Sequence, residues 1–396
     1  MPKSFTGTLN TNDFYNALFN AYRFMATLAD ELNGLDTSLA NKFKFDGGAY
    51  GDKTVVTAMD ILHSYEWDPT DGNVLAPGEK VEPKQQEIVV DQKRQISLYT
   101  DQYLTKRAWM TPEAFESFNT VVQSEINKTK NVYETRLMNV FIGTTEADKP
   151  NGKGAGQSQT VLIGTTDPED LRVRKVGRKI ANLLVELKDP SRKFNDYGHM
   201  QAYDKSDLII IWNADYLNEF NYVDLPVVFH KDGVIDFVGD KLLGSYFGKV
   251  LNETSTDPNY YGNYSASTPT TGKPIDSDDG TYVPGTGNAN GTLYSLIDQE
   301  VTVSGTKYEL SAGDELPAGA VVISSSKIVI PCYIGDSSII CKIVHKDGIK
   351  FPTGFQTSTE FFNAKNLSTN RYLTWMYGKP QYLADYPFIT LREVNS

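Results

Sequence analysis

A helical pattern of apolar positions marks residues 111–143. The positions recur at steps of three, four or seven residues: Phe115, Phe118, Val122, Ile126, Tyr133, Leu137 and Phe141. Thr111 and Pro112 are suited to the first turn of this helix, and Gly143 to its end. Roughly thirty residues with a rise of about 1.5 Å each make a helix about 45 Å long. Because the stripe is narrow, we expect a helix that packs along one side; a core or coiled-coil helix is the alternative.

The preceding chain predicts one more helix and then two extended runs. Residues 12–33 have helical apolar spacing and end at Gly34. Residues 55–67 and 88–106 have the composition of strands, and the segment between them, 68–87, is dense in Pro, Gly and charge. This pattern predicts a long two-stranded excursion.

We expect the excursion to be unstable by itself, because residues 91–95 are polar on both faces. The apolar residues around them, Ile88, Val90, Ile96 and Leu98, need a partner. We expect them to pack on a surface outside their own domain; a mobile loop is the alternative.

A second amphipathic helix is predicted over residues 167–190. Asp167 is the expected cap and Pro168 the expected first residue. The outer turns of this helix carry five basic residues: Arg172, Arg174, Lys175, Arg178 and Lys179. They indicate either a solvated face or a subunit contact.

The middle of the chain mixes strands and helices as an α+β protein does. The apolar run 208–212 predicts a buried strand, and a short helix capped from Asn213 follows it. Strands are expected around the turn at residues 232–233, a short helix over 239–251, and several closing strands after residue 327.

A change of composition between residues 253 and 299 predicts an insertion, since Asn, Thr, Ser, Gly, Pro and Tyr replace most aliphatic residues. Short β segments follow up to residue 326, so we expect a small β-rich lobe. A binding surface is one possible use of its tyrosines, which include Tyr260, Tyr261, Tyr264 and Tyr282. The acidic run 276–280 lacks calcium-loop spacing and predicts a turn.

Composition excludes several classes of protein. The formal net charge of -12 argues against sequence-independent nucleic-acid binding. No signal segment and no membrane-spanning run is present. Cys332 and Cys341 are expected to be buried free thiols.

Motifs for catalysis are missing from the sequence. The residues 151–159 only approach a dinucleotide-binding loop, because Gln157 replaces its third glycine, and a surface loop is expected there. The four histidines are scattered without metal-ligand spacing: His63, His199, His230 and His345. We therefore expect no catalytic, cofactor or metal site and no enzyme.

The order of these elements resembles the major capsid proteins of tailed bacteriophages, with the Hong Kong 97-like capsid fold. The resemblance rests on a short arm, the long excursion, a helix beginning TPEAFESF, an α+β domain containing LIIIWNADYLNEF, and the closing strands LTWMYGKPQYLADYPFITL. It covers nearly the whole chain except the insertion.

The resemblance implies a division of the chain into named parts. These are an N-terminal arm (1–54), an E-loop hairpin (55–106), a peripheral domain with the spine helix (107–166), an axial domain (167–252 and 327–360), the inserted lobe (253–326) and peripheral closing strands (361–396). The implied subunit contacts are Lys80, Lys84, Ile88, Val90, Arg94, Arg172, Arg174 and Arg178. Some family members are cross-linked through an E-loop lysine; no cross-link is predicted here.

The implied function is structural: hexamers and pentamers form an icosahedral shell around double-stranded DNA, without sequence-specific binding or membrane contact. The expected partners are other copies of the chain, a portal and a separate scaffolding protein, the last because the arm is short and begins at Met1. Synthesis in the host cytoplasm and residence in the virion follow. The alternatives are an encapsulin-type nanocompartment shell and a carbohydrate-binding or adhesive module carried by residues 253–326.

Overall fold

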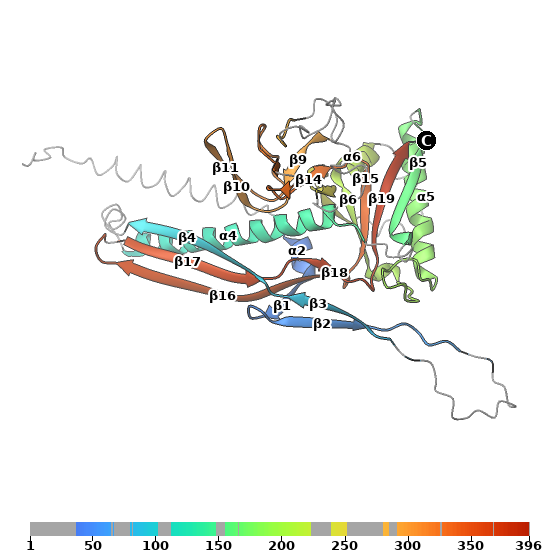
Figure 1. The fold of residues 1–396 in the computed structure, drawn as a ribbon, viewed down its shortest axis with the longest axis horizontal. Coiled ribbons are helices and arrows are strands. Elements are labelled where there is room, and N and C mark those ends of the chain that lie inside the picture. The colour runs from blue at the N-terminus through green and yellow to red at the C-terminus, as the bar shows by residue number, and fades with distance from the viewer. Residues whose placement is uncertain are drawn as a thin grey trace, which may run out of the picture. The chain divides into compact units, whose positions relative to one another are not determined.

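The computed structural model describes residues 37–64, 66, 80, 82–101, 112–147, 155–164, 166–222, 239–251, 280–284, 291–324, 327–366 and 368–395 (Figure 1). The predicted helix 12–33, the turn 232–233, His230 and most of the tyrosine-rich insertion lie outside these residues. The chain divides into two units. One comprises Met1–Ser38, Arg94–Thr135 and Gln356–Trp375, and the other comprises Leu39–Lys93, Arg136–Phe355 and Met376–Ser396.

A five-stranded sheet forms the core of the larger unit, in the order β5-β19-β15-β6-β7. Its strands are β5 (Ser158–Ile163), β6 (Leu208–Asn213), β7 (Asp240–Leu242), β15 (Ile339–His345) and β19 (Phe388–Asn395). The predicted buried strand is confirmed as β6. The next helix, α6 (Ala214–Tyr222), begins as predicted from Asn213, whose side chain accepts a hydrogen bond from the Asp215 backbone N–H at 3.1 Å.

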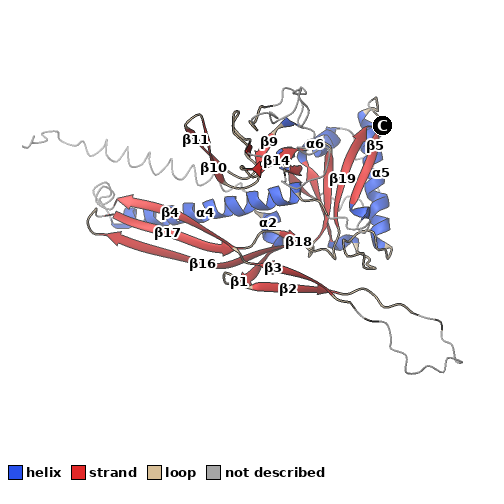
Figure 2. Cartoon of the chain, viewed as in Figure 1, coloured by secondary structure: helices blue, strands red, loops and turns tan. Residues whose placement is uncertain are grey.

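The helix α5 (Glu169–Lys188) covers one face of this sheet (Figure 2). Its predicted apolar positions Val173, Val176 and Leu183 are buried against strand residues such as Ile343. Asp167 does not cap the helix as predicted; the N-cap residue is Pro168. The Asp167 carboxylate instead accepts from the Gly164 N–H and pairs with Lys175.

The C-terminal turns of α4 (Pro112–Thr144) cover the opposite face of the same sheet, confirming the predicted long helix. The rings of Phe141 and Phe388 meet edge to face at 6.5 Å. The narrow apolar stripe does not describe this end of the helix, because Met138 and Ile142 outside the stripe are fully buried as well. Gly143 is helical and does not end α4; a Cβ there would collide with the Tyr246 carbonyl oxygen.

The excursion is confirmed as two antiparallel strands, β2 (Lys53–Ala58) and β3 (Lys84–Val89). The second predicted strand, 88–106, is divided: after Val90 the chain enters β4 (Gln92–Asp101), which belongs to another sheet. Ile88 and Val90 are buried inside their own chain, which corrects the prediction that they need an outside partner. The reason is that residues 44–48 form a strand nearby and that Val90 packs against Gly47 and Gly354.

The second sheet has the order β1-β16-β17-β4, with β18 paired to β16. Its strands are β1 (Lys44–Gly48), β16 (Ile349–Asn363), β17 (Ser368–Tyr377) and β18 (Gln381–Tyr382), together with β4. Within the smaller unit, the residues of α4 up to Thr135 lie along one face of β16, β17 and β4 (Figure 1). The closing segment 361–396 thus contributes strands to both sheets.

Residues 280–335, which we call the lobe, contain short β strands in the region where an inserted lobe (253–326) was predicted, but strands on both sides of the predicted bounds take part in its sheet. A three-stranded sheet joins β8 (Gly248–Val250), β14 (Cys332–Gly335) and β9 (Leu293–Ser295), and β10 (Gln299–Val303) forms a hairpin with β11 (Thr306–Leu310). The hairpin turn has positive φ at Ser304 and Gly305. A short two-stranded piece, β12 (Ile323–Ser324) and β13 (Lys327–Ile328), completes it.

Two local predictions around the lobe were wrong. Residues 239–251 contain β7, a single 3-10 turn (Gly244–Tyr246) and β8 instead of a short helix. Tyr282, expected on a binding surface, is fully buried in the core of the lobe, since that small sheet needs a large apolar ring to fill it. The lobe is tied to α4 by an ion pair between Arg136 and Asp314 at 2.8 Å.

Both cysteines are buried and unbridged, as predicted. His199 and His345 are buried, whereas His63 is exposed. Across the described part of the chain, no helix has the length and apolarity needed to cross a membrane.

Candidate subunit-contact surfaces

The solvent-facing stripe of α5 is the first candidate contact surface. Leu171, Arg174, Arg178 and Val185 are exposed and follow one another at helical spacing. Arg172 does not belong to the stripe, because it forms an ion pair with Glu393 at 3.1 Å within its own chain. Exposed arginines beside exposed aliphatic side chains are typical of protein interfaces.

Charged residues elsewhere on α5 are engaged locally. A hydrogen bond from Lys175 lowers the pKa of the Asp167 carboxyl. Tyr216 also donates a hydrogen bond to Glu393, at 2.6 Å, so that carboxylate has two partners. Of the predicted contact residues on this helix, Arg174 and Arg178 are exposed on its outer face.

The excursion is the second candidate surface. It carries a run of exposed apolar side chains, Val55, Met59, Ile61 and Leu62, of which the last three follow β2 directly. This run was predicted as part of the strand 55–67, and its exposure was not predicted. The sequence did contain a signal for the end of the strand, because Asp60 interrupts the apolar run just after the last residue of β2.

Both ends of the excursion are fastened to the larger unit. Asp60 pairs with Arg192 and accepts a hydrogen bond from the Met200 backbone N–H at 2.9 Å. Gln86 on β3 donates to the Tyr382 carbonyl oxygen at 2.8 Å and accepts from the Ala384 N–H at 3.0 Å. The base of the excursion is therefore fixed by side-chain hydrogen bonds on both of its strands.

A network of buried polar side chains supports this base. His199 Nδ1 lies 2.7 Å from Asp385 Oδ1. The side-chain oxygen of Asn195 accepts a hydrogen bond from the His199 backbone N–H at 2.8 Å. Gln157, predicted to be in a surface loop, is buried; it bonds to Asp196 and accepts from the Phe388 N–H at 2.7 Å. Buried amides with both partners satisfied fix the loops that carry them.

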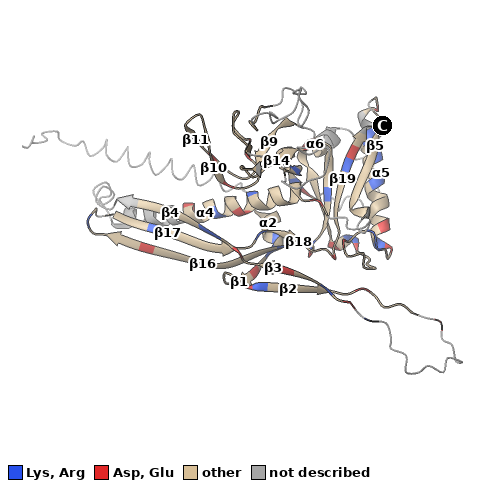
Figure 3. Cartoon of the chain, in the orientation of Figure 1, with Lys and Arg blue, Asp and Glu red and all other residues tan. Residues whose placement is uncertain are grey.

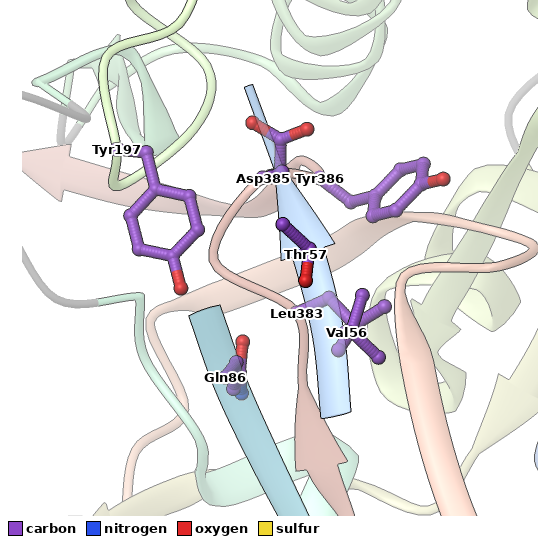
Figure 4. A pocket seen from close by; sticks show the side chains of 8 residues that line it. Val56, Thr57, Gln86, Tyr197, Leu383, Asp385 and Tyr386 are labelled. Carbon is purple, nitrogen blue, oxygen red and sulfur yellow. The ribbon is translucent and has the colours of Figure 1, made fainter. Parts of the chain in front are cut away.

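A small cavity of about 70 Å³ lies beside this network (Figure 4). Its walls come from β2, β3, the loop at Tyr197 and the segment 383–386, and the carboxylate of Asp385 is one of the lining groups. Burial raises the pKa of the Asp385 carboxyl despite the neighbouring His199. The cavity has room for a few water molecules, and it lies where the excursion joins its supporting loops.

The remaining predicted contact residues are found in different surroundings. Lys80 and Lys84 are exposed on the excursion, and Lys80 lies 3.5 Å from Glu82. Arg94 packs over the ring of Tyr133, with its guanidinium carbon 3.9 Å from the ring centroid. Ile88 and Val90 are buried within their own chain. Among the described residues, no group of three His, Cys, Asp or Glu side chains is arranged to hold a metal ion.

Comparisons with known proteins identify the class of protein that has this arrangement. A structure described as the capsid of Staphylococcus phage Andhra matches with a TM-score of 0.58 and 10% identity, over 91% of this chain and 85% of that one. A structure described as head fiber and inner core protein gp22 of native bacteriophage P68 matches with a TM-score of 0.53 and 10% identity, over 88% and 82%. The mixed α/β fold is therefore similar to that of phage capsid structures.

A comparison of the sequence with models of protein families identifies the family of this chain. The model of the Phi29-like phage major capsid protein family matches residues 6–383, nearly the whole chain. The chain belongs to this family and is a phage major capsid protein, a component of the virion. No curated protein matches. The family match supports the phage interpretation and neither the nanocompartment nor the carbohydrate-binding alternative.

Proposed function

We propose that this chain assembles as hexamers and pentamers into an icosahedral shell that encloses double-stranded DNA. In this proposal the fold is Hong Kong 97-like: α4 is the spine helix, β2 and β3 form the E-loop, and the lobe of residues 280–335 belongs to an insertion. The role is structural, without a catalytic step, and the chain is made in the host cytoplasm.

The observation that carries the proposal is that the excursion has a fixed base and, directly after β2, a run of exposed apolar residues. Met59, Ile61 and Leu62 are each more than half exposed, although Asp60 between them accepts a partly buried hydrogen bond from the Met200 backbone N–H. Exposed apolar runs of this kind mark protein contacts. A fixed base lowers the entropy lost when such a run binds a neighbouring copy.

Two pairs of basic residues are proposed to contribute further subunit contacts. Lys80 and Lys84 lie on the E-loop, and Arg174 and Arg178 lie on the outer face of α5. A chain of net charge -12 offers many carboxylates as partners for them. These contacts are modest individually, but symmetry repeats each of them throughout a closed shell.

The proposed partners are other copies of the chain, a portal and a separate scaffolding protein. The DNA is proposed to be enclosed rather than bound by sequence, because net negative charge opposes close contact with phosphates. High ionic strength should therefore affect contacts between subunits more than it affects contacts with the genome.

Assembly can be tested with two matched variants of the full chain, produced with its proposed scaffolding partner. Replacing Met59, Ile61 and Leu62 with Asp should abolish closed particles in negative-stain micrographs while the circular dichroism spectrum is unchanged. Replacing Val321 and Val329, similarly exposed on the lobe, should leave particles intact. Wild-type chain that remains monomeric at high concentration with its partner would contradict the proposed function.

A further inference from the structure

Among the described residues, the sheet of the smaller unit is covered on one face and open on the other. On the covered face, α4 contacts all three strands: Arg94 of β4 and Trp375 of β17 meet the ring of Tyr133, and Gln356 of β16 accepts a hydrogen bond from Lys130 at 2.6 Å. Because side chains alternate along a strand, the residues next to these point away from α4. They form what we call the open face.

The open face is defined by ten residues: Gln95, Ser97 and Tyr99 on β4, Asn370, Tyr372 and Thr374 on β17, and Thr357, Thr359, Phe361 and Asn363 on β16. Two contacts confirm that these side chains share one face. Gln95 donates a hydrogen bond to Thr374 at 3.1 Å, and the rings of Phe361 and Tyr372 meet at 6.1 Å.

None of these ten residues carries a formal charge, although charged residues make up 22% of the chain. On the covered side, Arg371 pairs with Glu360 at 3.3 Å. The charged residues Lys93 and Asp101 lie in β4 just before and just after the uncharged positions 95, 97 and 99. Figure 3 shows β16 and β17 mostly without charge colouring, in contrast to α5. A face that is meant to stay in water would be expected to carry charges.

The open face also exposes large aromatic rings. Phe361 is 63% exposed and Tyr99 is 59% exposed. Aromatic residues are enriched and charged residues are depleted at the centres of protein interfaces. The lack of Lys and Arg argues against DNA as the occupant, because phosphate binding requires cations.

The charge of the chain favours a second copy as the occupant. Two copies, each of net charge -12, repel each other on approach, and the repulsion is smallest where the meeting surfaces are uncharged. The face measures roughly 300 Å², from three strands about 4.8 Å apart and about 3.3 Å per residue. A stable two-body interface buries about 800 Å² on each partner, so this face fits one contact among several.

We propose that the open face of β16, β17 and β4 is a contact surface for a second copy of this chain in the assembled shell. The inference rests on the proposed function, and it assigns to assembly a face distinct from the E-loop and from the outer stripe of α5. The contact is uncharged, so it depends weakly on salt, unlike contacts through Arg174 and Arg178.

The contact can be tested by placing a charge on the open face. Phe361→Glu and, as a change that removes no aromatic ring, Thr359→Glu should each lower the yield of closed particles at least tenfold. The control Tyr308→Glu changes an aromatic residue that is 40% exposed on β11 and should leave the yield unchanged. Circular dichroism and thermal unfolding of the unassembled chain establish that each variant folds.

The outcomes separate this inference from the proposed function. If the wild-type chain forms no particles, the proposed function fails; if wild type and both variants form particles in equal yield, only the open-face contact is wrong. A photo-crosslinking p-benzoylphenylalanine at position 361 in assembled particles should give a covalent dimer of this chain. Crosslinking to DNA, to a different protein, or at no more than the level seen with the probe at position 308 would overturn the proposal.

Discussion

The two sheets of this protein are covered to different extents. The five-stranded sheet is sandwiched between α5 and the C-terminal turns of α4, and every residue of β15 is buried. The segments of β16, β17 and β4 in the smaller unit have α4 on one face only, and residues 358–363 are all exposed. The first sheet can be stable within one chain, whereas the second leaves surface that a partner can cover.

The comparison separates folding from assembly. Where both faces are buried, a side chain contributes to the free energy of folding of the single chain. A side chain on an open face contributes little to the free energy of folding. It contributes instead to the free energy of association between copies. Substitutions in the two sheets should therefore affect different measurements.

The largest effect is expected for Ile343→Ala in the centre of β15. Ile343 is fully buried, so the substitution should lower the free energy of unfolding by about 2–5 kcal/mol. Urea denaturation of the unassembled chain measures this loss. The control Thr359→Ala on the open face should change it by less than about 0.5 kcal/mol. Equal losses at both positions would refute the contrast between the sheets.

The next effect is expected at Lys342, which is fully buried on β15. Its ammonium donates to the Thr145 carbonyl oxygen and to Thr390 Oγ1, each at 2.9 Å. Desolvation lowers the pKa of Lys342 to about 7, and Glu146, Asp336, Arg392 and Cys341 modify this value less. Below pH 7 the lysine is protonated in both states, and the folded state bears the full cost of a buried charge.

Raising the pH from 7 toward the ordinary lysine pKa should therefore stabilise the folded state, because only the unfolded chain still binds the proton. The gain is on the order of a few kcal/mol. Lys342→Met should remove this dependence, so its stability relative to wild type should fall as the pH rises from 7 to 10. Exposed Lys241→Met is the control, and chemical denaturation at several pH values is the measurement. A difference between Lys342→Met and wild type that is constant with pH would contradict the assignment.

A smaller effect is expected for Arg94→Ala on the covered face of the second sheet. Its guanidinium lies over Tyr133 beneath α4, so loss of this contact should cost about 1 kcal/mol of folding free energy. Arg94 was predicted from sequence to contact another subunit, and that prediction requires a loss of assembly instead. Comparing urea denaturation with particle yield distinguishes the two roles.

The smallest effect on folding is expected for Gln95→Ala, the adjacent residue on the open face. Its hydrogen bond to Thr374 is exposed, so the free energy of unfolding should change by less than about 0.5 kcal/mol. Any effect of this variant should appear in particle yield. A loss of stability larger than that of Arg94→Ala would show that the open face is not solvent-exposed in the single chain.

Much of the fold could be predicted from local sequence. Pattern and composition located α4, α5, β6 and the β-rich lobe, since helical spacing and apolar runs are properties of neighbouring residues. A two-stranded excursion was also predicted, but its second strand was placed at residues 88–106, whereas the strand that pairs with β2 is Lys84–Val89. Ile88 and Val90 were taken for contact residues because the sequence does not show that Gly47 and Gly354 make room for Val90.

The candidate site was predicted less well than the fold. Arg172 and Arg178 look alike in the sequence of α5, yet Arg172 is paired with Glu393 from β19, 221 residues away. The open face was not predicted either, because the alternation in β4 shows two faces without showing which of them α4 covers.

The sequence by itself determined α4, α5, α6, several strands, the buried thiols and the family resemblance, because periodicity and element order are encoded along the chain. Only the tertiary structure decided which residues are left for partners. Burial depends on contacts between segments that are distant in the sequence. Such contacts place Arg94 against α4, leave Phe361 exposed to solvent, and hold the base of the excursion through Asp60 and Gln86.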